Sequence, residues 1–229
     1  MSDKVILNEM FYSLQGEGAL AGVASVFIRL AGCPLRCKWC DTKYAWDEKA
    51  GKEYSLAEIV HFIEQQPAGH IVITGGEPMV SADLPALLEA VAALGSHVTI
   101  ETAGIKYLPG LKCNLMSISP KLSNSLPADE KLRQEHTKSC LNIEAIKNLM
   151  DEYDYQLKFV VDEREDLNEI AEIVDKLNPN PDRIVLMPQA VNKAEYISRA
   201  EFVAQACIRS GFRFSPRLQV ILWNSQRGR

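Results

Sequence analysis

Short runs of β-branched residues alternate with longer amphipathic segments along most of the chain, and this alternation limits the possible folds more than any other feature. The runs predict strands at residues 5–11, 26–30, 71–74, 98–101, 115–119, 157–161, 184–187 and 218–222. The segments between them predict helices at residues 55–66, 84–95, 143–153, 167–177 and 194–210. This alternation favours a largely parallel α/β sheet covered by helices, with a site at the strand ends. The pattern leaves open whether the sheet closes into a full barrel.

Composition excludes several classes of protein. The 229 residues are 47% apolar and 24% charged, which suits one compact domain over residues 1–229. The formal net charge of −5 provides no positive field for nucleic acid. No apolar run approaches the ~20 residues that span a bilayer, and the chain does not begin with a charged segment followed by an apolar one, as a signal peptide would. We therefore expect a cytoplasmic protein that binds neither nucleic acid nor membranes.

Three of the six cysteines are crowded into eight positions. Cys33, Cys37 and Cys40 have the spacing C-x3-C-x2-C and follow a predicted strand and an Ala-Gly turn. A loop this short directs three sulfurs at one centre. Three thiolates fit a [4Fe–4S] cluster with one open iron, or a zinc site closed by His61 or His70, and free thiols are the third possibility.

Two further features point to a ligand site. Gly75-Gly76-Glu77-Pro78 begins 35 positions after Cys40 and directly follows a predicted strand. Glycines let a backbone approach a ligand closely, and a carboxylate can accept hydrogen bonds from an ammonium group. Arg29 lies within the apolar strand VFIRL, where an unpaired charge would be costly, so we expect it to bind an anion.

Two polar segments are predicted to lie on the surface. Residues 123–140 are polar and charge-rich, which is typical of an exposed loop. Residues 162–175 are acidic and predict a solvated helix face.

Taken together, the motifs resemble the radical S-adenosylmethionine (SAM) superfamily, and within it the 7-carboxy-7-deazaguanine synthase family. The matching segments are QGEG at 15–18, FIRLAGC at 27–33, CDT at 40–42, GGEP at 75–78, ETAG at 101–104 and SPK at 119–121. The resemblance implies an incomplete TIM-like barrel. It also implies a lyase that converts 6-carboxy-5,6,7,8-tetrahydropterin into 7-carboxy-7-deazaguanine and ammonia, a step toward queuosine.

The same resemblance assigns cofactors and residues. Cys33, Cys37 and Cys40 would hold a [4Fe–4S] cluster, whose open iron chelates SAM and cleaves it to a hydrogen-abstracting radical. Thr42 would coordinate Mg2+. The residues expected around the pterin are Leu14, Gln15, Gly16, Glu17, Arg29 and Thr74. The residues expected around SAM are Trp39, Cys40, Asp41, Gly76, Glu77, Ser119, Pro120, Lys121 and Gln189.

The resemblance further implies a homodimer and an electron donor such as a flavodoxin. One departure from the family is Gln219, where relatives often have a histidine. Glutamine cannot carry a proton, so any role of that histidine is in doubt here.

Two alternative functions remain open at this stage. A glycyl-radical-enzyme activase would share the cysteine loop but would leave residues 15–18 and Arg29 unexplained. A non-catalytic zinc module would make residues 75–78 an ordinary turn.

Overall fold

The computed structural model describes residues 3–228 and contains one curved sheet of nine strands in the order β3-β1-β2-β4-β5-β6-β7-β8-β9. The first strand pairs antiparallel with its two neighbours, and every later pair from β2 to β9 is parallel. The strands are β1 (Lys4–Leu14), β2 (Ala24–Leu30), β3 (Lys52–Ser55), β4 (His70–Gly75), β5 (His97–Thr102), β6 (Leu115–Ile118), β7 (Tyr155–Val161), β8 (Ile184–Pro188) and β9 (Arg213–Phe214).

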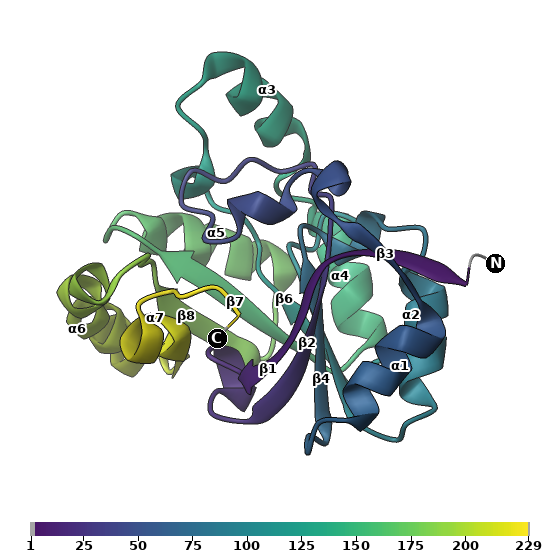
Figure 1. Ribbon diagram of the computed structural model, residues 1–229. Helices are drawn as coiled ribbons and strands as arrows, with labels where there is room; N and C mark the ends of the chain where they lie inside the picture. Colours follow the sequence, from purple (N-terminus) through teal and green to yellow (C-terminus); the bar gives the residue numbers. More distant parts are fainter. Residues whose placement is uncertain (1–2, 229) are drawn as a thin grey trace.

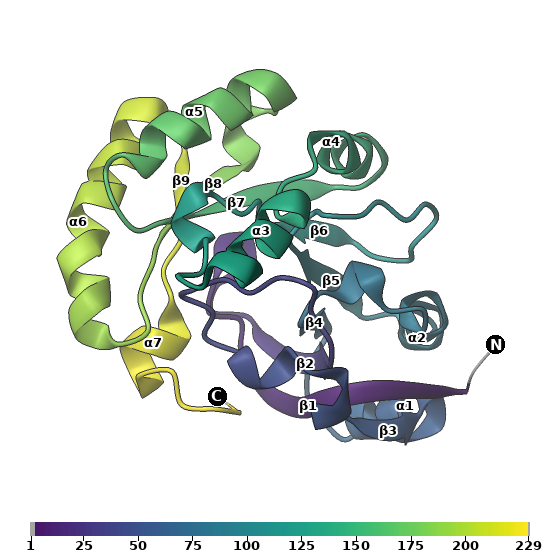
Figure 2. The same ribbon diagram turned by 90° about the horizontal axis from the view of Figure 1, so that it is seen from above.

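Helices cover the outer face of this sheet, and one helix lies over its open end. They are α1 (Leu56–Glu64), α2 (Leu84–Ala92), α3 (Glu130–Ser139), α4 (Ile143–Glu152), α5 (Asp166–Leu177), α6 (Lys193–Ser210) and α7 (Leu218–Trp223). In Figure 1, α3 projects from the top of the molecule, and Figure 2, seen from above, places it over the middle of the ring of helices. Ser55 and Glu58 form the predicted capping box at the start of α1.

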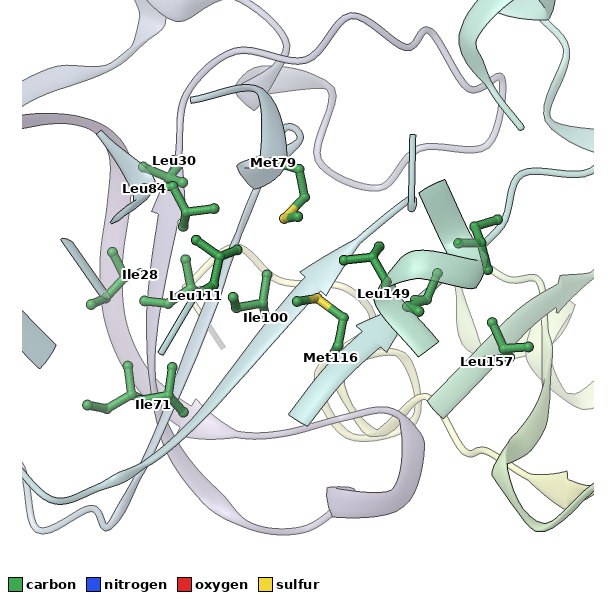
Figure 3. Close-up of a cluster of buried hydrophobic side chains, with 14 of the residues drawn as sticks. Ile28, Leu30, Ile71, Met79, Leu84, Ile100, Leu111, Met116, Leu149 and Leu157 are labelled. Carbon is green, nitrogen blue, oxygen red and sulfur yellow. The ribbon is translucent and has the colours of Figure 1, made fainter. Parts of the chain in front are cut away.

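The strand register separates two faces of the sheet. Ile28 pairs with Ile73, Ile73 with Ile100, and Ile100 with Met116. These side chains are fully buried against the helices, and Figure 3 shows part of this core, including Met79, Leu111 and Leu149. Because successive side chains on a strand point to opposite faces, the residues between them point into the half-barrel. The inner face therefore carries the polar side chains of the strands.

The sheet does not close. Its end strands β3 and β9 each pair with one neighbour only, which agrees with the expected incomplete barrel. Among residues 3–228, no helix is long and apolar enough to cross a membrane.

The prediction of a strand at residues 218–222 is wrong, because Leu218–Trp223 forms α7. The run LQVILW is short and continuously apolar, so its periodicity cannot separate a strand from a helix. The prediction of a plain surface loop at residues 123–140 is also wrong. This segment contains α3, whose first turn is capped by Asp129 through the backbone amide of Leu132. The edge strands β3 and β9 were not predicted.

Candidate active site

A cavity of 270 Å3 opens at the carboxyl ends of the parallel strands. The inner faces of β2, β4, β5, β7 and β8 contribute side chains to its lining, and the N-terminal, cysteine-bearing and C-terminal segments supply the rest. This is the position at which α/β barrels place their sites. The strand residues in the lining are Phe11, Leu14, Phe27, Arg29, Val72, Thr74, Gly75, Glu101, Thr102, Lys158, Val160 and Met187.

The three clustered cysteines all line this cavity. Their loop is fixed by backbone hydrogen bonds, from the Cys33 amide to the Trp46 carbonyl (3.1 Å) and from the Cys40 amide to the Cys37 carbonyl (3.1 Å). Cys37 is buried beside Leu35. Cys140 packs against the same apolar cluster but does not line the cavity. Three thiols therefore face the cavity together.

These thiols fit a cluster better than a single ion. Among residues 3–228, no group of three or more Cys, His, Asp or Glu side chains is arranged to hold one metal ion. A tetrahedral zinc site needs sulfurs about 2.3 Å from one centre, whereas each thiolate of a [4Fe–4S] cluster binds a different iron. Burial raises the pKa of Cys33 to about 12 and that of Cys37 to about 11. The thiols of Cys33 and Cys37 are thus protonated in the metal-free protein, and binding of a metal cluster must displace those protons.

Neither His61 nor His70 is placed to be the fourth ligand of a zinc site. His61 is exposed on α1. His70 is buried, and both of its ring nitrogens are occupied, Nδ1 by Ser25 Oγ (2.7 Å) and Nε2 by Thr99 Oγ1 (2.9 Å). Neither histidine lines the cavity with the cysteines.

The Gly-Gly-Glu-Pro turn packs directly under the cysteine loop. Gly75 has φ 153°, and a Cβ atom on Gly76 would lie 2.0 Å from the carbonyl oxygen of Gly32. The Glu77 amide donates to that same Gly32 carbonyl (3.0 Å). The two glycines therefore allow a close approach between two backbone segments.

The Glu77 carboxylate is buried and already has three donors. It accepts from Thr102 Oγ1 (2.6 Å), the Ala103 amide (2.7 Å) and the Met79 amide (3.1 Å). Burial is the largest influence on this group and raises its pKa above the usual range. Glu77 thus ties the end of β4 to the end of β5 while it lines the cavity.

A network of buried charges forms another side of the cavity. Lys158 donates to Glu17 Oε2 (2.8 Å) and to Glu101 Oε2 (2.9 Å). Arg217 donates to Glu17 Oε1 (3.1 Å) and to Asp41 Oδ2 (2.6 Å). Burial alone would raise the pKa of Glu17, but the cations of Lys158 and Arg217 hold that pKa well below its usual range. The network therefore keeps charged groups at the cavity.

Gln15 and Gln219 complete this network. Gln15 donates to Glu101 Oε1 (3.2 Å), and its own oxygen accepts from the Glu17 amide (3.2 Å). Gln219 donates to Glu17 Oε1 (2.7 Å), while its buried Oε1 has no hydrogen-bond partner among the described residues. A Cβ atom on Gly16 would lie 1.9 Å from that Oε1, so the glycine leaves room for the Gln219 side chain.

Arg29 lines the cavity as predicted, but it also has a protein partner. Its Nε donates to Glu9 Oε1 (2.8 Å), and Tyr44 donates to the same oxygen (2.9 Å). The guanidinium lies 5.8 Å from the ring centre of Phe11, which stacks on Phe27 at 4.8 Å. Its terminal nitrogens make no hydrogen bond with the part of the chain described, so they remain available to an anion in the cavity.

The structure brings together all but two of the residues expected at the site. Pro120 and Gln189 do not line the cavity, although Gln189 directly follows β8. Thr42 lies at the cavity with its Oγ1 3.5 Å from Cys40 Sγ. The other expected residues in the lining are Leu14, Gln15, Gly16, Glu17, Arg29, Cys33, Cys37, Trp39, Cys40, Asp41, Thr74, Gly76, Glu77, Ser119 and Lys121.

Several lining residues escaped the sequence analysis. Lys158 and Arg217 pair with Glu17 across the cavity, and Arg227 bonds Glu9 Oε2 (2.9 Å). Lys158 carried a usable signal, because it interrupts the apolar strand YQLKFVV just as Arg29 interrupts VFIRL. No comparable pattern surrounds Arg217 or Arg227.

Comparison with known proteins identifies the family of this chain. A model of the radical SAM superfamily matches residues 27–119. The chain is 38% identical to the 7-carboxy-7-deazaguanine synthase of Halobacterium salinarum, over 95% of this chain and 90% of that protein. It is 36% identical to the enzyme of the same name from Pyrobaculum aerophilum, over 99% of this chain and 98% of that protein.

Two solved structures are similar to this chain in fold. The crystal structure of QueE from Escherichia coli matches with a TM-score of 0.69 and 26% identity, over 93% of each chain. Streptococcus suis SuiB, at 17% identity and a TM-score of 0.54, shares the fold over 80% of this chain.

Proposed function

The chain belongs to the 7-carboxy-7-deazaguanine synthase family of the radical SAM superfamily, and from this premise we propose that its cavity converts 6-carboxy-5,6,7,8-tetrahydropterin into 7-carboxy-7-deazaguanine with release of ammonia. Membership makes the protein a radical SAM lyase of 7-deazapurine biosynthesis, with a [4Fe–4S] cluster and SAM as cofactors. The proposal adds the substrate and the residues that bind it.

One observation carries the proposal. Three thiols and a set of fixed charges line the same cavity at the strand ends. The thiols suit a redox cluster, and the charges suit a small heterocycle that has both donors and an anionic group. A protein substrate, as in a glycyl-radical-enzyme activase, would leave this enclosed charge network without a use.

The cofactors occupy the thiol side in this proposal. Cys33, Cys37 and Cys40 hold the cluster, and the bound cluster and SAM together supply a one-electron, hydrogen-abstracting chemistry. Lys121 donates to Ser119 Oγ (3.0 Å) and lies 5.5 Å from the ring centre of Trp39. These side chains form a polar and aromatic surface on which the SAM molecule binds.

The substrate occupies the charged side. Arg29 binds the pterin carboxylate with its terminal nitrogens, while its Nε stays on Glu9. Glu17 accepts from the donor edge of the pterin ring. It lines the cavity, and its Oε2 has Lys158 as its one hydrogen-bond donor among residues 3–228. Lys158 and Arg217 keep Glu17 ionised for this purpose.

We assign the magnesium ion to Thr42. A threonine hydroxyl is a weak ligand alone, and Mg2+ usually completes its shell with water and substrate oxygens. Thr42 lines the cavity beside Cys40, and in this assignment a carboxylate of the bound substrate shares the ion. Thr42→Val should therefore raise the Mg2+ concentration needed for half-maximal product formation, whereas Thr42→Ser should resemble the wild type.

The test is an anaerobic incubation of the cluster-reconstituted protein with reductant, SAM, Mg2+ and 6-carboxytetrahydropterin, read by mass spectrometry. Formation of 7-carboxy-7-deazaguanine over many turnovers is expected. Arg29→Gln should raise KM for the pterin without abolishing the release of 5′-deoxyadenosine from SAM. Cys37→Ala should abolish both.

Each failure has a separate meaning. Release of 5′-deoxyadenosine without the deazapurine would keep the radical chemistry and overturn the substrate. Absence of both products from a protein with a verified cluster would overturn the assignment of the cysteine loop.

We further propose that the enzyme works in the cytoplasm as a homodimer and takes electrons from a donor such as a flavodoxin. The unpaired edge at β9 and the exposed Phe214 on it offer a surface that a second copy could cover. Sedimentation of the purified protein tests the dimer, and replacement of the chemical reductant by a reduced flavodoxin tests the donor.

A further inference from the structure

Helix α3 is attached to the molecule through a single buried residue. Its ten residues are mostly polar, and the only buried one among them is His136, which is 1% exposed. A helix normally attaches through an apolar stripe of several residues. Attachment through one histidine indicates that the contact of this side chain, rather than apolar burial, determines where α3 lies.

His136 contacts the cysteine loop through its ring. Nδ1 accepts a hydrogen bond from the backbone amide of Arg36 (3.0 Å), and Nε2 lies 2.9 Å from Ser125 Oγ. An amide can only donate, so Nδ1 must be the unprotonated nitrogen and Nε2 must carry the proton. Ser125 Oγ accepts a hydrogen bond from the Nε2–H group and donates one to the Leu122 carbonyl (2.6 Å). The partners therefore fix one tautomer of the ring.

A second hydrogen bond from the same region holds the other side of Cys37. The Lys38 amide donates to the backbone carbonyl of Ser125 (2.9 Å). The amides of Arg36 and Lys38 flank Cys37 directly, and both are bonded to residues of the segment 122–140. The backbone on each side of the central cysteine is thus held by groups outside the cysteine loop.

The base of this segment is itself fixed to the sheet and to α5. Ser123 donates to Glu169 through its amide (3.0 Å) and its hydroxyl (2.6 Å). Asn124 donates to the Val160 carbonyl (3.0 Å) and to Asp166 (2.8 Å), and its oxygen accepts from Trp39 Nε1 (3.1 Å). Hydrogen bonds to α5 and β7 therefore fix the start of the segment 122–140, which in turn contacts the cysteine loop.

We propose that His136 is a positioning residue that holds Cys37 in the orientation required to bind the cluster. The inference rests on the proposed function, in which Cys37 is a cluster ligand. His136 acts through the Arg36 amide and touches neither cofactor nor substrate. A loop ordered before metal arrives loses less conformational freedom on binding, so it binds the cluster more tightly and releases it more slowly.

Two amide substitutions separate the two ring nitrogens. Asparagine places its side-chain oxygen near the position of Nδ1, so His136→Asn keeps an acceptor for the Arg36 amide. Glutamine reaches toward the position of Nε2, so His136→Gln keeps a partner for Ser125 and leaves the Arg36 amide without one. Each variant loses one ring contact, which makes them matched controls for any general effect on folding.

The first measurement is amide hydrogen exchange on the full-length metal-free chain. Exchange in the peptide that contains residues 36–38 should be about five- to tenfold faster in His136→Gln than in His136→Asn, which should resemble the wild type. Peptides from β4 and β5 should exchange alike in all three proteins.

The second measurement uses the reconstituted protein. Iron should pass to a chelator about five- to tenfold faster from His136→Gln than from His136→Asn, and the reduction potential of the cluster should shift in the glutamine variant alone. A purely structural role would destabilise both variants alike and would leave the potential unchanged.

Equal exchange and equal iron release in the two variants would overturn the inference. Failure of the wild-type chain to form a [4Fe–4S] cluster would overturn the proposed function instead, and the exchange data on the metal-free chain would still decide whether His136 orders the loop.

Discussion

Individual charged residues of the inner face explain why this cavity is a site rather than a packed core. Lys158 and Arg217 are almost fully buried and together form ion pairs with Glu17, Glu101 and Asp41. Buried ion pairs of this kind add little net stability over apolar packing, but the loss of one partner is costly. The network thus keeps polar groups fixed in a place where hydrophobic side chains would otherwise be favoured.

Replacement of Lys158 tests this reasoning. Lys158→Met leaves Glu101 without a cation and Glu17 with Arg217 alone, so the free energy of unfolding should fall by about 3–5 kcal/mol. Lys112→Met is the matched control, because Lys112 forms an exposed ion pair with Glu89 and its loss should be undetectable. Urea titration at pH 7.5 measures both. An equal effect of the two substitutions would mean that the buried network is not coupled to folding.

Gly76 offers a second prediction at this scale. Gly76→Ala places a Cβ atom against the backbone of Gly32, directly before the first cysteine. Because backbone cannot move aside as a flexible side chain does, the cysteine loop should shift, and both Tm and bound iron after reconstitution should fall. Gly69→Ala meets no atom within 4 Å and should not lower either value. Full iron content in Gly76→Ala would contradict the close approach.

Residues with a local motif were predictable, and residues with a distant partner were not. Glu17, Arg29, Cys33 and Glu77 lie in short patterns whose chemistry can be interpreted from neighbouring letters. Lys158 and Glu17 are 141 positions apart, and Arg217 and Glu17 are 200 positions apart. Only the folded sheet brings such groups together.

Strands and helices also divide into those that the local sequence predicts and those that it does not. The parallel strands β2 and β4 to β8 were predicted because each is a β-branched run flanked by turn residues. α3 was not, because its composition is polar and its one buried side chain is a histidine. α7 was predicted as a strand because five apolar or amide residues in a row carry no decisive period.

A polar layer joins three strands at the end of the half-barrel opposite the cavity. His70 of β4 bonds Ser25 of β2 and Thr99 of β5, and it lies 5.0 Å from the ring of His97. Burial, assisted by His97, lowers the pKa of His70 to about 4. The neutral ring is therefore the one that fits the folded state.

This layer predicts a loss of stability in mild acid. The unfolded chain binds a proton at His70 near its ordinary pKa of 6.5, whereas the folded chain resists protonation until about pH 4. The free energy of unfolding should therefore fall as pH drops from 6.5 toward 4, by at most about 3 kcal/mol from this residue. Urea titrations between pH 7.5 and 5 measure the slope.

His70→Gln should flatten that slope, while His61→Gln, on the exposed face of α1, should leave it unchanged. The low pKa of Glu17 has its effect only at lower pH, because its stabilisation is lost as pH falls below the ordinary range of a carboxyl. If the free energy of unfolding had the same dependence on pH with and without His70, a group other than His70 would be responsible for the loss of stability.

At the scale of the whole molecule, hydrogen bonds outside the strand ladder join the turn that follows β1 to the segment that follows β9. We call this join the seam, formed by Gly16, Glu17 and Gly18 on one side and Ser215, Arg217, Leu218 and Gln219 on the other. The Leu218 amide donates to the Gly16 carbonyl (3.0 Å), and the Gly18 amide donates to Ser215 Oγ (2.7 Å). Hydrophobic periodicity could predict a parallel sheet, but it carries no information on such a closure.

The C-terminal segment extends the seam over the cavity. Arg227 bonds Glu9 (2.9 Å) and Asn8 (2.9 Å) and lies 4.2 Å from the ring centre of Tyr44. Arg227→Ala should change the free energy of unfolding by no more than about 1 kcal/mol, because the pair is half exposed. Amide exchange of residues 225–228, which line the cavity, should nevertheless become faster.

Arg183→Ala, which removes an ion pair with Asp154 elsewhere on the surface, should leave that exchange unchanged. Unaltered exchange in Arg227→Ala would mean that other contacts hold the C-terminal segment in place.

The seam also sets an order of assembly during translation. The three cysteines and His136 all precede residue 141, whereas Arg217 and Gln219 are translated after them. Because chains fold from the N-terminus as they emerge, the metal-binding half can take shape while the pterin half is still unfinished. Until residues 215–219 emerge, the seam cannot form, and the end of β2 that leads into the cysteine loop faces an open trough.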